Sequence, residues 1–312
     1  MLSDRDEPAR PLGRAPSATS PSLAVASDLV RARFEVRDRL VQLDPAVDYQ
    51  EIYRTTATVE FPWDVTRALE LALYRTFAIP SIAALLDQTG EFRLRTQKRY
   101  DDTALLLAHA LEAGLESAEG RAAVSRINRI HARFEISNDD YLYTLGTFVF
   151  VPLRWLDRWG WRPLLAVERE AMFRYYERLG TLMGIRTIPP TLMAFEEWFD
   201  AYEVKNVSYG EPQERTAAAT RELFVSWFPG VLAPALRVGV NALLDGPIRE
   251  AFGFPAPPRW LPVATDVGLR GRARVERLLP PRAKPASTQD SILIKSYPNG
   301  HTLEDLGPTS AR

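Results

Sequence analysis

The stretch from Arg121 to Ile185 constrains the fold of this chain more than any other part of it. Val124, Ile127 and His131 are separated by three and four residues, and this spacing places them on one face of an α-helix. Phe134 continues the same spacing three residues later. The face is otherwise apolar, so the pattern predicts a helix that carries one imidazole into the protein interior.

The sequence pattern of the rest of the chain also favours helices. Between residues 93 and 131 no run alternates polar and apolar side chains as a half-buried strand would. We expect a single large all-α domain of roughly nine or ten helices with irregular N-terminal and C-terminal tails. The helices are expected at about residues 28–43, 64–79, 82–86, 93–113, 121–134, from 138 onward, 164–183, 192–206, 214–227 and 231–244.

Composition shifts suggest where the domain begins and ends. Residues 1–27 are rich in Pro, Ser, Ala and Arg and predict a disordered tail; a transit peptide is the alternative, but three early acidic residues oppose it. We place the helical domain at 28–268. Residues 269–312 are expected to form a basic segment, 270–282, and an irregular tail in which Ile292–Lys295 is the only plausible short strand.

The amino-acid composition restricts the kinds of catalytic and metal site that the chain can form. The chain has no cysteine, which excludes disulfides, thiolate nucleophiles, iron–sulfur clusters and a Cys-ligated haem. Its three histidines, His109, His131 and His301, are far apart in sequence, so a protein-built zinc or non-haem iron site would need long-range convergence. A haem needs only one protein nitrogen. The net charge of −1 argues against a nucleic acid as partner.

His131 therefore has two interpretations that residue type alone leaves open. In the first it is a neutral core histidine with one nitrogen hydrogen-bonded. In the second it is the axial ligand of an iron in a flat apolar cofactor. We interpret His109 as structural, because it faces the apolar side of its helix, and we expect His301 to be exposed in the tail.

A second group of polar residues lies upstream. Arg99, Asp102 and Thr103 are spaced for one helix face, which by itself suggests an ordinary Arg–Asp pair on a solvated surface. The apolar run Leu105–Leu107 follows directly and indicates that this helix enters the interior. The aromatic residues Tyr141–Trp161 are expected to pack in the core; the functional alternative is the wall of an apolar channel or haem pocket.

Several segments together resemble the fungal mpaB oxygenases, relatives of the rubber oxygenases or latex-clearing proteins. The resemblance extends from about Phe61 to the C-terminus and is carried by an ordered set of motifs, none strong alone. The segments are Arg95-Thr-Gln-Lys-Arg-Tyr-Asp-Asp-Thr103, Arg126–His131, Ile136-Ser-Asn-Asp-Asp-Tyr-Leu-Tyr-Thr-Leu145, Trp161-Arg-Pro-Leu164, Gly180-Thr-Leu-Met-Gly-Ile185 and Tyr297–Pro308.

The resemblance implies a haem b-dependent oxygenase that uses O₂ to cleave a C=C bond in an apolar, isoprenoid-like substrate, with His131 as iron ligand. In the rubber oxygenases an Arg, a Lys three residues later and a Thr four residues later lie on the distal side of the haem. Arg99 and Thr103 match two of these positions, but Asp102 replaces the Lys. Asp102 is then a possible base or a partner of Arg99. A register on Arg95 and Lys98 would keep the Lys and lose the Thr.

Two other functions remain open: a non-catalytic carrier or sensor of haem or of an apolar ligand, and a haem enzyme of the same fold with a different oxidation. We expect a cytoplasmic, soluble protein, because no segment has the roughly 20 apolar residues of a spanning helix and the anchor of the fungal enzymes is not visible. The basic segment offers a contact to haem propionates or to an anionic membrane surface.

Overall fold

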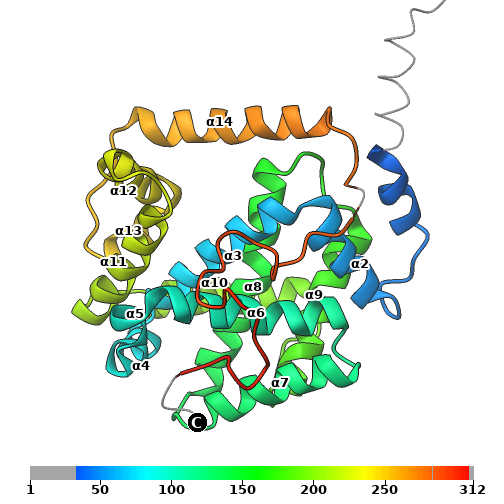
Figure 1. Ribbon diagram of the computed structural model, residues 1–312, viewed down its shortest axis with the longest axis horizontal. Coiled ribbons are helices and arrows are strands. Elements are labelled where there is room, and N and C mark those ends of the chain that lie inside the picture. The colour runs from blue at the N-terminus through cyan, green and yellow to red at the C-terminus, as the bar shows by residue number, and fades with distance from the viewer. Residues whose placement is uncertain (1–32, 283, 309–312) are drawn as a thin grey trace, which may run out of the picture.

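The computed structural model describes residues 33–282 and 284–308, and within these ranges the protein is all-helical, as expected, and contains no β-strand (Figure 1). The tail expected at residues 1–27 lies outside the described part. The helices are α2 (Tyr49–Thr55), α3 (Pro62–Phe77), α4 (Pro80–Thr89), α5 (Glu91–Leu94), α6 (Thr96–Ala113), α7 (Ala118–His131), α8 (Asn138–Trp159), α9 (Ala166–Leu182), α10 (Leu192–Asn206), α11 (Glu211–Ser226), α12 (Ala233–Leu243), α13 (Gly246–Ala251) and α14 (Trp260–Arg277). A π-helical segment, Thr56–Glu60, joins α2 to α3, and a 3₁₀ turn, Gly230–Leu232, precedes α12.

The described part has more helices than the nine or ten expected, because α2, α5, α13 and α14 were not predicted as helices. The helix expected at 28–43 is helical over 33–40 in the described part. The helix expected at residues 121–134 extends too far at its C-terminal end. Helix α7 ends at His131, so Phe134 lies beyond the helix rather than on its face. Val124 and Ile127 are buried on that face, as predicted.

Helix α8 is the centre of the bundle. Helix α3 packs along it, and α9 and α10 pack against its other sides. Gly146 of α8 permits the close approach of α10, since a Cβ built there would lie 2.6 Å from Cδ2 of Phe199. Gly180 of α9 plays the same part beside Leu145 of α8, at 2.6 Å. Small residues at these two crossings let aromatic side chains fill the core.

A buried charge cluster fixes the loop after α8. Arg162 donates to Oε2 of Glu60 at 2.7 Å and to Oε2 of Glu168 at 2.7 Å, and all three side chains are almost fully buried. Glu168 also accepts from the backbone N–H of Leu165, where α9 begins. One guanidinium thus joins the π-helical segment to the first turn of α9.

A second apolar cluster packs α4, α5, α11 and α13 against the end of α3. Its buried aromatic residues include Phe77, Phe92 and Phe252. In Figure 1 these helices form the group beside the main bundle, and α6 runs from this group toward α7. Helix α6 therefore contacts α5 and α11 of this group as well as α7 of the main bundle.

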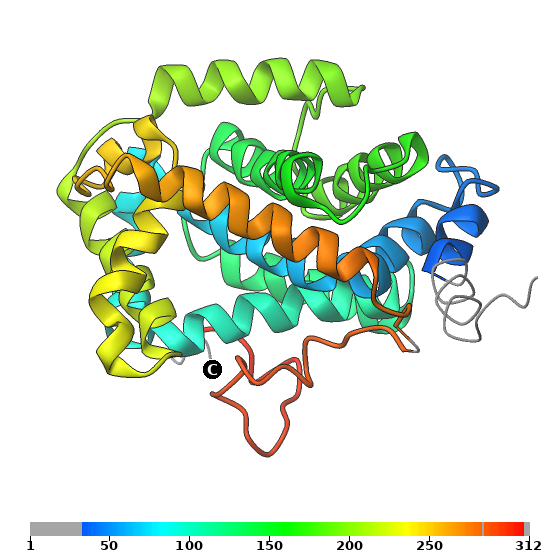
Figure 2. The same ribbon diagram turned by 90° about the horizontal axis from the view of Figure 1, so that it is seen from above.

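Residues 284–308, which we call the C-terminal strap, wrap back over the bundle in irregular structure (Figures 1 and 2). The short strand expected at Ile292–Lys295 is wrong: this segment forms turns, and Ile292 is 89% exposed. The backbone N–H groups of Lys295 and Ser296 donate to Oδ2 of Asp101, at 3.1 and 2.8 Å, instead of to a neighbouring strand. Arg126 of α7 donates to the carbonyl oxygen of Leu306 at 2.8 Å.

The basic segment expected from residue 270 is largely helical. It forms the second half of α14, so the boundary proposed between 268 and 269 falls inside a helix. Figure 2 shows α14 lying across one face of the bundle, nearest the viewer, and Figure 1 shows it from the side. No single described helix is long and apolar enough to cross a membrane; α3 and α4 meet that test only as a pair, bent by 98°.

Candidate active site

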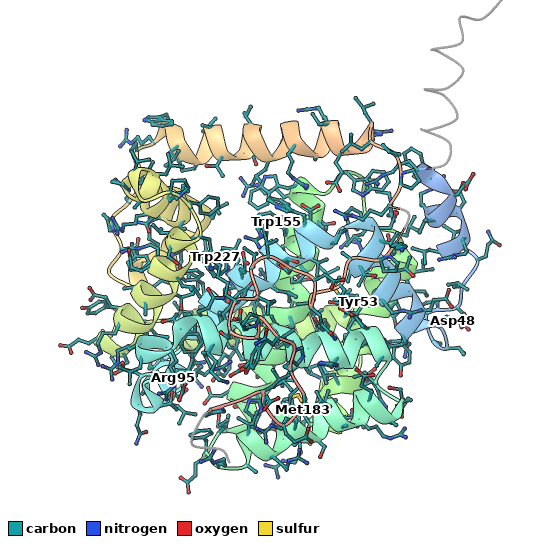
Figure 3. The ribbon with its side chains drawn as sticks, in the orientation of Figure 1. Asp48, Tyr53, Arg95, Trp155, Met183 and Trp227 are labelled. Atoms are coloured by element: carbon teal, nitrogen blue, oxygen red, sulfur yellow. The ribbon has the colours of Figure 1, made fainter. Side chains whose placement is uncertain are left out.

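Helices α3, α6, α7, α8 and α9 and the C-terminal strap surround a cavity of about 670 Å³. This volume is within the usual range of small-molecule sites, about 300–1,000 Å³. The walls are mainly apolar and aromatic, and Figure 3 labels two residues of the lining, Tyr53 and Met183. Val65, Leu107, Phe148 and Leu179 contribute further apolar surface. The lining also includes charged and polar side chains from several elements, among them Glu70, Arg99, Asp102, Thr103 and His131.

His131 is the last residue of α7 and lines this cavity. Its Nδ1 is buried and has no hydrogen-bond partner among the described residues. The ring meets that of Tyr141 edge to face, with centroids 5.6 Å apart. Burial, aided by the charge of Arg99, lowers the pKa of His131 from 6.5 to about 4. The imidazole is therefore neutral near pH 7, which is the form that binds a metal.

Arg99 and Thr103 lie one turn apart on α6, and both line the same cavity as His131. A guanidinium N–H of Arg99 donates to the Thr103 hydroxyl. Within residues 33–282 and 284–308 Arg99 forms no ion pair with a carboxylate; burial lowers its pKa, and its guanidinium carbon lies 5.1 Å from the centre of the Phe92 ring. The carboxylates of Asp102 and Glu91 act on this cation without a direct ion pair, so its N–H groups can bind a negatively charged or strongly polar group.

Asp102 lines the cavity but is already engaged. Its carboxylate binds Lys98 Nζ at 2.8 and 2.9 Å and accepts a hydrogen bond from the Tyr297 hydroxyl at 2.5 Å. It is not hydrogen-bonded to Arg99, so the structure does not show the surface Arg–Asp pair that spacing alone suggested. Lys98 also donates to the carbonyl oxygen of Gly307 at 2.8 Å. The pair of Lys98 and Asp102 therefore ties the C-terminal strap to α6.

The alternative register fits the cavity less well. Arg95 is the N-cap residue of α6, 42% exposed and ion-paired with Glu91, and Figure 3 shows it at the start of the helix. Neither Arg95 nor Lys98 lines the cavity. The register on Arg99 and Thr103 is the one that brings side chains to the same space as His131.

Sequence reasoning did not single out Glu70, an acid of α3 that lines the cavity. Its Oε1 accepts from the Tyr100 hydroxyl at 2.9 Å and lies 2.7 Å from Arg67 Nη2. Burial raises the pKa of Glu70 from 4.5 to about 7 despite the opposing charge of Arg67. The sequence contained an indication that Glu70 is buried, since it lies between Leu69 and Leu71 in the apolar half of its helix.

The aromatic residues of α8 divide between two roles. Tyr141 and Phe148 line the cavity, which fits the pocket-wall interpretation. Phe150 and Trp155 are buried in the core instead, as plain packing predicts. Trp155 also donates to Asp64 of α3 at 2.9 Å, on the side of the bundle that faces α14 (Figure 3).

His109 and His301 meet away from the cavity. His109 Nδ1 lies 2.6 Å from Glu119 Oε1, and its Nε2 lies 2.9 Å from Nε2 of His301. The expectation of an exposed His301 is therefore wrong, because the strap places it against α6. The described residues contain no group of three or more His, Cys, Asp or Glu side chains that could hold a metal ion.

Comparison with known proteins finds a matching family model and related sequences. Residues 65–275 match the model of the catalytic domain of "ER-bound oxygenase mpaB/B'/Rubber oxygenase". The chain is 28% identical over 237 residues to an ER-bound oxygenase mpaB of Penicillium roqueforti, covering 70% of this chain and 79% of the relative. It is 29% identical over 251 residues to mpaB' of Penicillium brevicompactum, covering 74% and 59% of the two chains.

A third relative, the ER-bound oxygenase mpaB of Penicillium brevicompactum, is 31% identical over 169 residues, which cover 51% of this chain and 43% of the relative. The matched stretch of the family model begins in α3 and ends in α14. It thus includes α6 and α7, which carry Arg99, Thr103 and His131, and it covers more than half of the chain. The chain belongs to the mpaB and rubber oxygenase catalytic-domain family.

Proposed function

We propose that this oxygenase-family protein is a haem b-dependent enzyme that uses O₂ to cleave a C=C bond in an apolar, isoprenoid-like substrate. In such a reaction the double bond breaks, and each of its carbons gains one oxygen atom of O₂ as a carbonyl. The observation that carries the proposal is the neutral imidazole of His131, with an unpartnered nitrogen, in the apolar cavity that also contains Arg99.

The residues of the cavity fit a haem. His131 would hold the iron, and the apolar walls would accommodate the flat ring. Haem, when bound, would supply the iron chemistry by which O₂ reacts. The chain's own contribution is to exclude water with its aromatic and aliphatic lining and to provide polar groups, among them Arg99 and Thr103 on α6.

Arg99 is a permanent cation and hydrogen-bond donor that forms no direct ion pair with a described carboxylate, and Thr103 accepts a hydrogen bond from one of its N–H groups. We propose that Arg99 stabilises negative charge that develops during the reaction and that Thr103 orients it. A base for a substrate proton is available in Glu70, whose raised pKa suits proton transfer near neutral pH. Asp102 is the alternative base, but its carboxylate already binds Lys98 and Tyr297.

The test is the visible absorption spectrum of the protein expressed with a haem precursor. We expect a Soret band that His131→Ala abolishes or shifts, while His109→Ala, which changes a histidine outside the cavity, leaves it intact. A folded wild-type protein without the band, or an unchanged band in His131→Ala, would refute the ligand assignment. A haem protein that consumes no O₂ with any alkene would favour the carrier or sensor alternative.

The mass of the product distinguishes C=C cleavage from hydroxylation, which is one different oxidation that a haem enzyme of the same fold could perform. Cleavage splits the carbon skeleton into two carbonyl compounds, whereas hydroxylation adds one oxygen atom to an intact skeleton.

The relatives are named ER-bound, and an apolar substrate concentrates in lipid. We therefore propose that the protein works in association with a membrane, in place of the cytoplasmic location expected from sequence.

A further inference from the structure

Three polar side chains of helix α14, Asp266, Arg272 and Glu276, are turned toward the protein. Oδ1 of Asp266 accepts from Arg158 Nε at 2.9 Å and from Trp159 Nε1 at 3.0 Å, both on α8. Arg272 binds Oδ1 of Asp64 on α3 at 2.5 Å. Glu276 lies 2.6 Å from Arg272 Nη1. Ion pairs thus add to the packing of Ala273 and Leu269 against the core, the contact by which a surface helix usually attaches.

The outward face of α14 is apolar. Trp260, Val263 and Val267 are 66%, 64% and 63% exposed, and Leu278 at the end of the helix is 69% exposed. Their spacing of three, four and eleven residues keeps them on one side of the helix. Val275 beside them is 60% exposed. Between Val267 and Leu278 this side of the helix carries Gly271 and the exposed Arg274, so apolar and basic side chains share it. Isolated exposed apolar residues are ordinary, but several on one side of a long helix indicate a binding surface.

Arginines border this stripe. Arg259, Arg270, Arg274 and Arg277 are all exposed, whereas the only acids of α14, Asp266 and Glu276, are turned inward in ion pairs. In the described part of the chain Arg274 and Arg277 form no ion pair. Exposed charge along α14 is therefore positive. A helix with an apolar face that includes Trp, a basic flank and no exposed acid matches the chemistry of an anionic lipid surface.

We propose that the outward face of α14 docks on an anionic membrane surface, with Trp260, Val263 and Val267 entering the interfacial layer and the bordering arginines meeting lipid phosphates. A second copy of the chain fits less well, because pairing two such faces about a twofold axis would bring arginines of like charge together. The proposal concerns a surface and stands whether or not the cavity binds haem.

The docking face lies next to a wall of the cavity. The guanidinium of Arg272 lies 4.0 Å from the centre of the Trp63 ring, and Trp63 lines the cavity. Trp63 is itself 39% exposed. A membrane bound on α14 would therefore lie close to this end of the cavity, a short path for an apolar ligand that partitions into lipid.

The experiment is cosedimentation of the full chain with phosphatidylcholine vesicles, with and without phosphatidylserine. We expect binding that requires phosphatidylserine and that falls at least tenfold in Val263→Ser/Val267→Ser. Arg274→Gln should weaken it by about fivefold, the effect of one cationic side chain near an anionic surface. The matched control is Val204→Ser on α10, a valine 89% exposed on another helix, which should bind as the wild type does.

Two readouts keep the test independent of catalysis and of folding. Circular dichroism melts should be alike in all variants, since the substituted side chains are mostly exposed. Vesicles with brominated acyl chains should quench tryptophan fluorescence less in Trp260→Phe than in the wild type. The proposal is overturned if the wild type does not bind, if the double variant binds equally well, or if sedimentation equilibrium shows that the face mediates self-association.

Discussion

Asp102 accepts a 2.5 Å hydrogen bond from the hydroxyl of Tyr297, 195 residues later in the chain. The same carboxylate binds Lys98 through both oxygens. Together these contacts join the helix that carries Arg99 and Thr103 to the strap that closes one side of the cavity. A residue that spacing placed among the catalytic candidates is thus also a structural link.

Asp102→Asn should destabilise the protein. The substitution keeps the shape of the side chain but leaves the Lys98 ammonium without its counter-ion, at a cost of about 2 kcal/mol after allowing for partial exposure of Lys98. Tyr297→Phe removes the hydroxyl that bonds Asp102, Lys98 and the carbonyl oxygen of Asp305, and should cost about 1–2 kcal/mol. Urea unfolding measures both. An Asp102→Asn variant of wild-type stability that has lost turnover would instead identify Asp102 as the base.

Glu70 gives the stability of the protein a pH dependence with a definite sign. Because its pKa is raised from 4.5 to about 7 in the folded state, the folded protein binds more protons than the unfolded chain between these values. Stability from this group is therefore present at low pH and lost as pH rises from about 4.5 to 7, by about 3 kcal/mol.

Comparing Glu70→Gln with the wild type in urea unfolding at several pH values isolates this contribution. The variant should lack the decline attributed to Glu70 and should be the more stable of the two at pH 8. If Glu70 is also the base, the same variant should retain its Soret band and lose turnover. A wild-type pH profile that Glu70→Gln leaves unchanged would contradict the raised pKa.

The sequence allowed the fold class and the position of His131 to be predicted because both depend on local periodicity. Val124 and Ile127 are buried where a helical face required it, and Arg99 and Thr103 share the side of α6 that reaches the cavity. These are relations within one helix, and the spacing of residues determines them. The termination of α7 at His131 was missed, since the local sequence Ala-Arg-Phe contains no strong helix breaker.

Contacts between distant segments were beyond such reasoning. Lys98 and Tyr297 are 199 residues apart, and nothing in either segment indicates the other. Helix α14 was missed for another reason: the four prolines of residues 255–262 argue against a helix where it begins, and both its inward and outward sides mix apolar with charged side chains, so no clear helical periodicity appears. The strand expected at Ile292 failed because Asp101 satisfies the neighbouring backbone N–H groups.

Arg162→Ala should be strongly destabilising. The substitution leaves the buried carboxylates of Glu60 and Glu168 facing each other without a cation, a loss of about 3–5 kcal/mol. The matched control is Arg158→Ala, four residues earlier, whose pair with Asp266 is 56% exposed on the arginine side and should contribute less than about 1 kcal/mol. Equal unfolding midpoints for the two variants would show that the buried cluster is not a stabilising element.

Gly146→Ala should destabilise the crossing of α8 and α10. The new methyl group would lie 2.6 Å from the ring of Phe199, which is fully buried and cannot move aside, so we expect a loss of about 1–3 kcal/mol. Gly239→Ala on α12 is the control: nothing lies within 4 Å of its added Cβ, and helix propensity should make it neutral or stabilising by up to about 1 kcal/mol.

Arg99→Met should separate catalysis from cofactor binding. Methionine keeps much of the length of the side chain but removes the cation, so the haem content that depends on His131 should persist, while turnover of an alkene substrate falls by roughly 10²-fold, the usual effect of removing one stabilising donor. Arg95→Met removes a cation from the same helix outside the cavity and should leave turnover within about twofold. Soret absorbance and O₂ uptake measure the two quantities on the same samples. If Arg99→Met lost haem and turnover together, Arg99 would be a cofactor-binding residue; if it lost neither, the cation would have no part in the reaction.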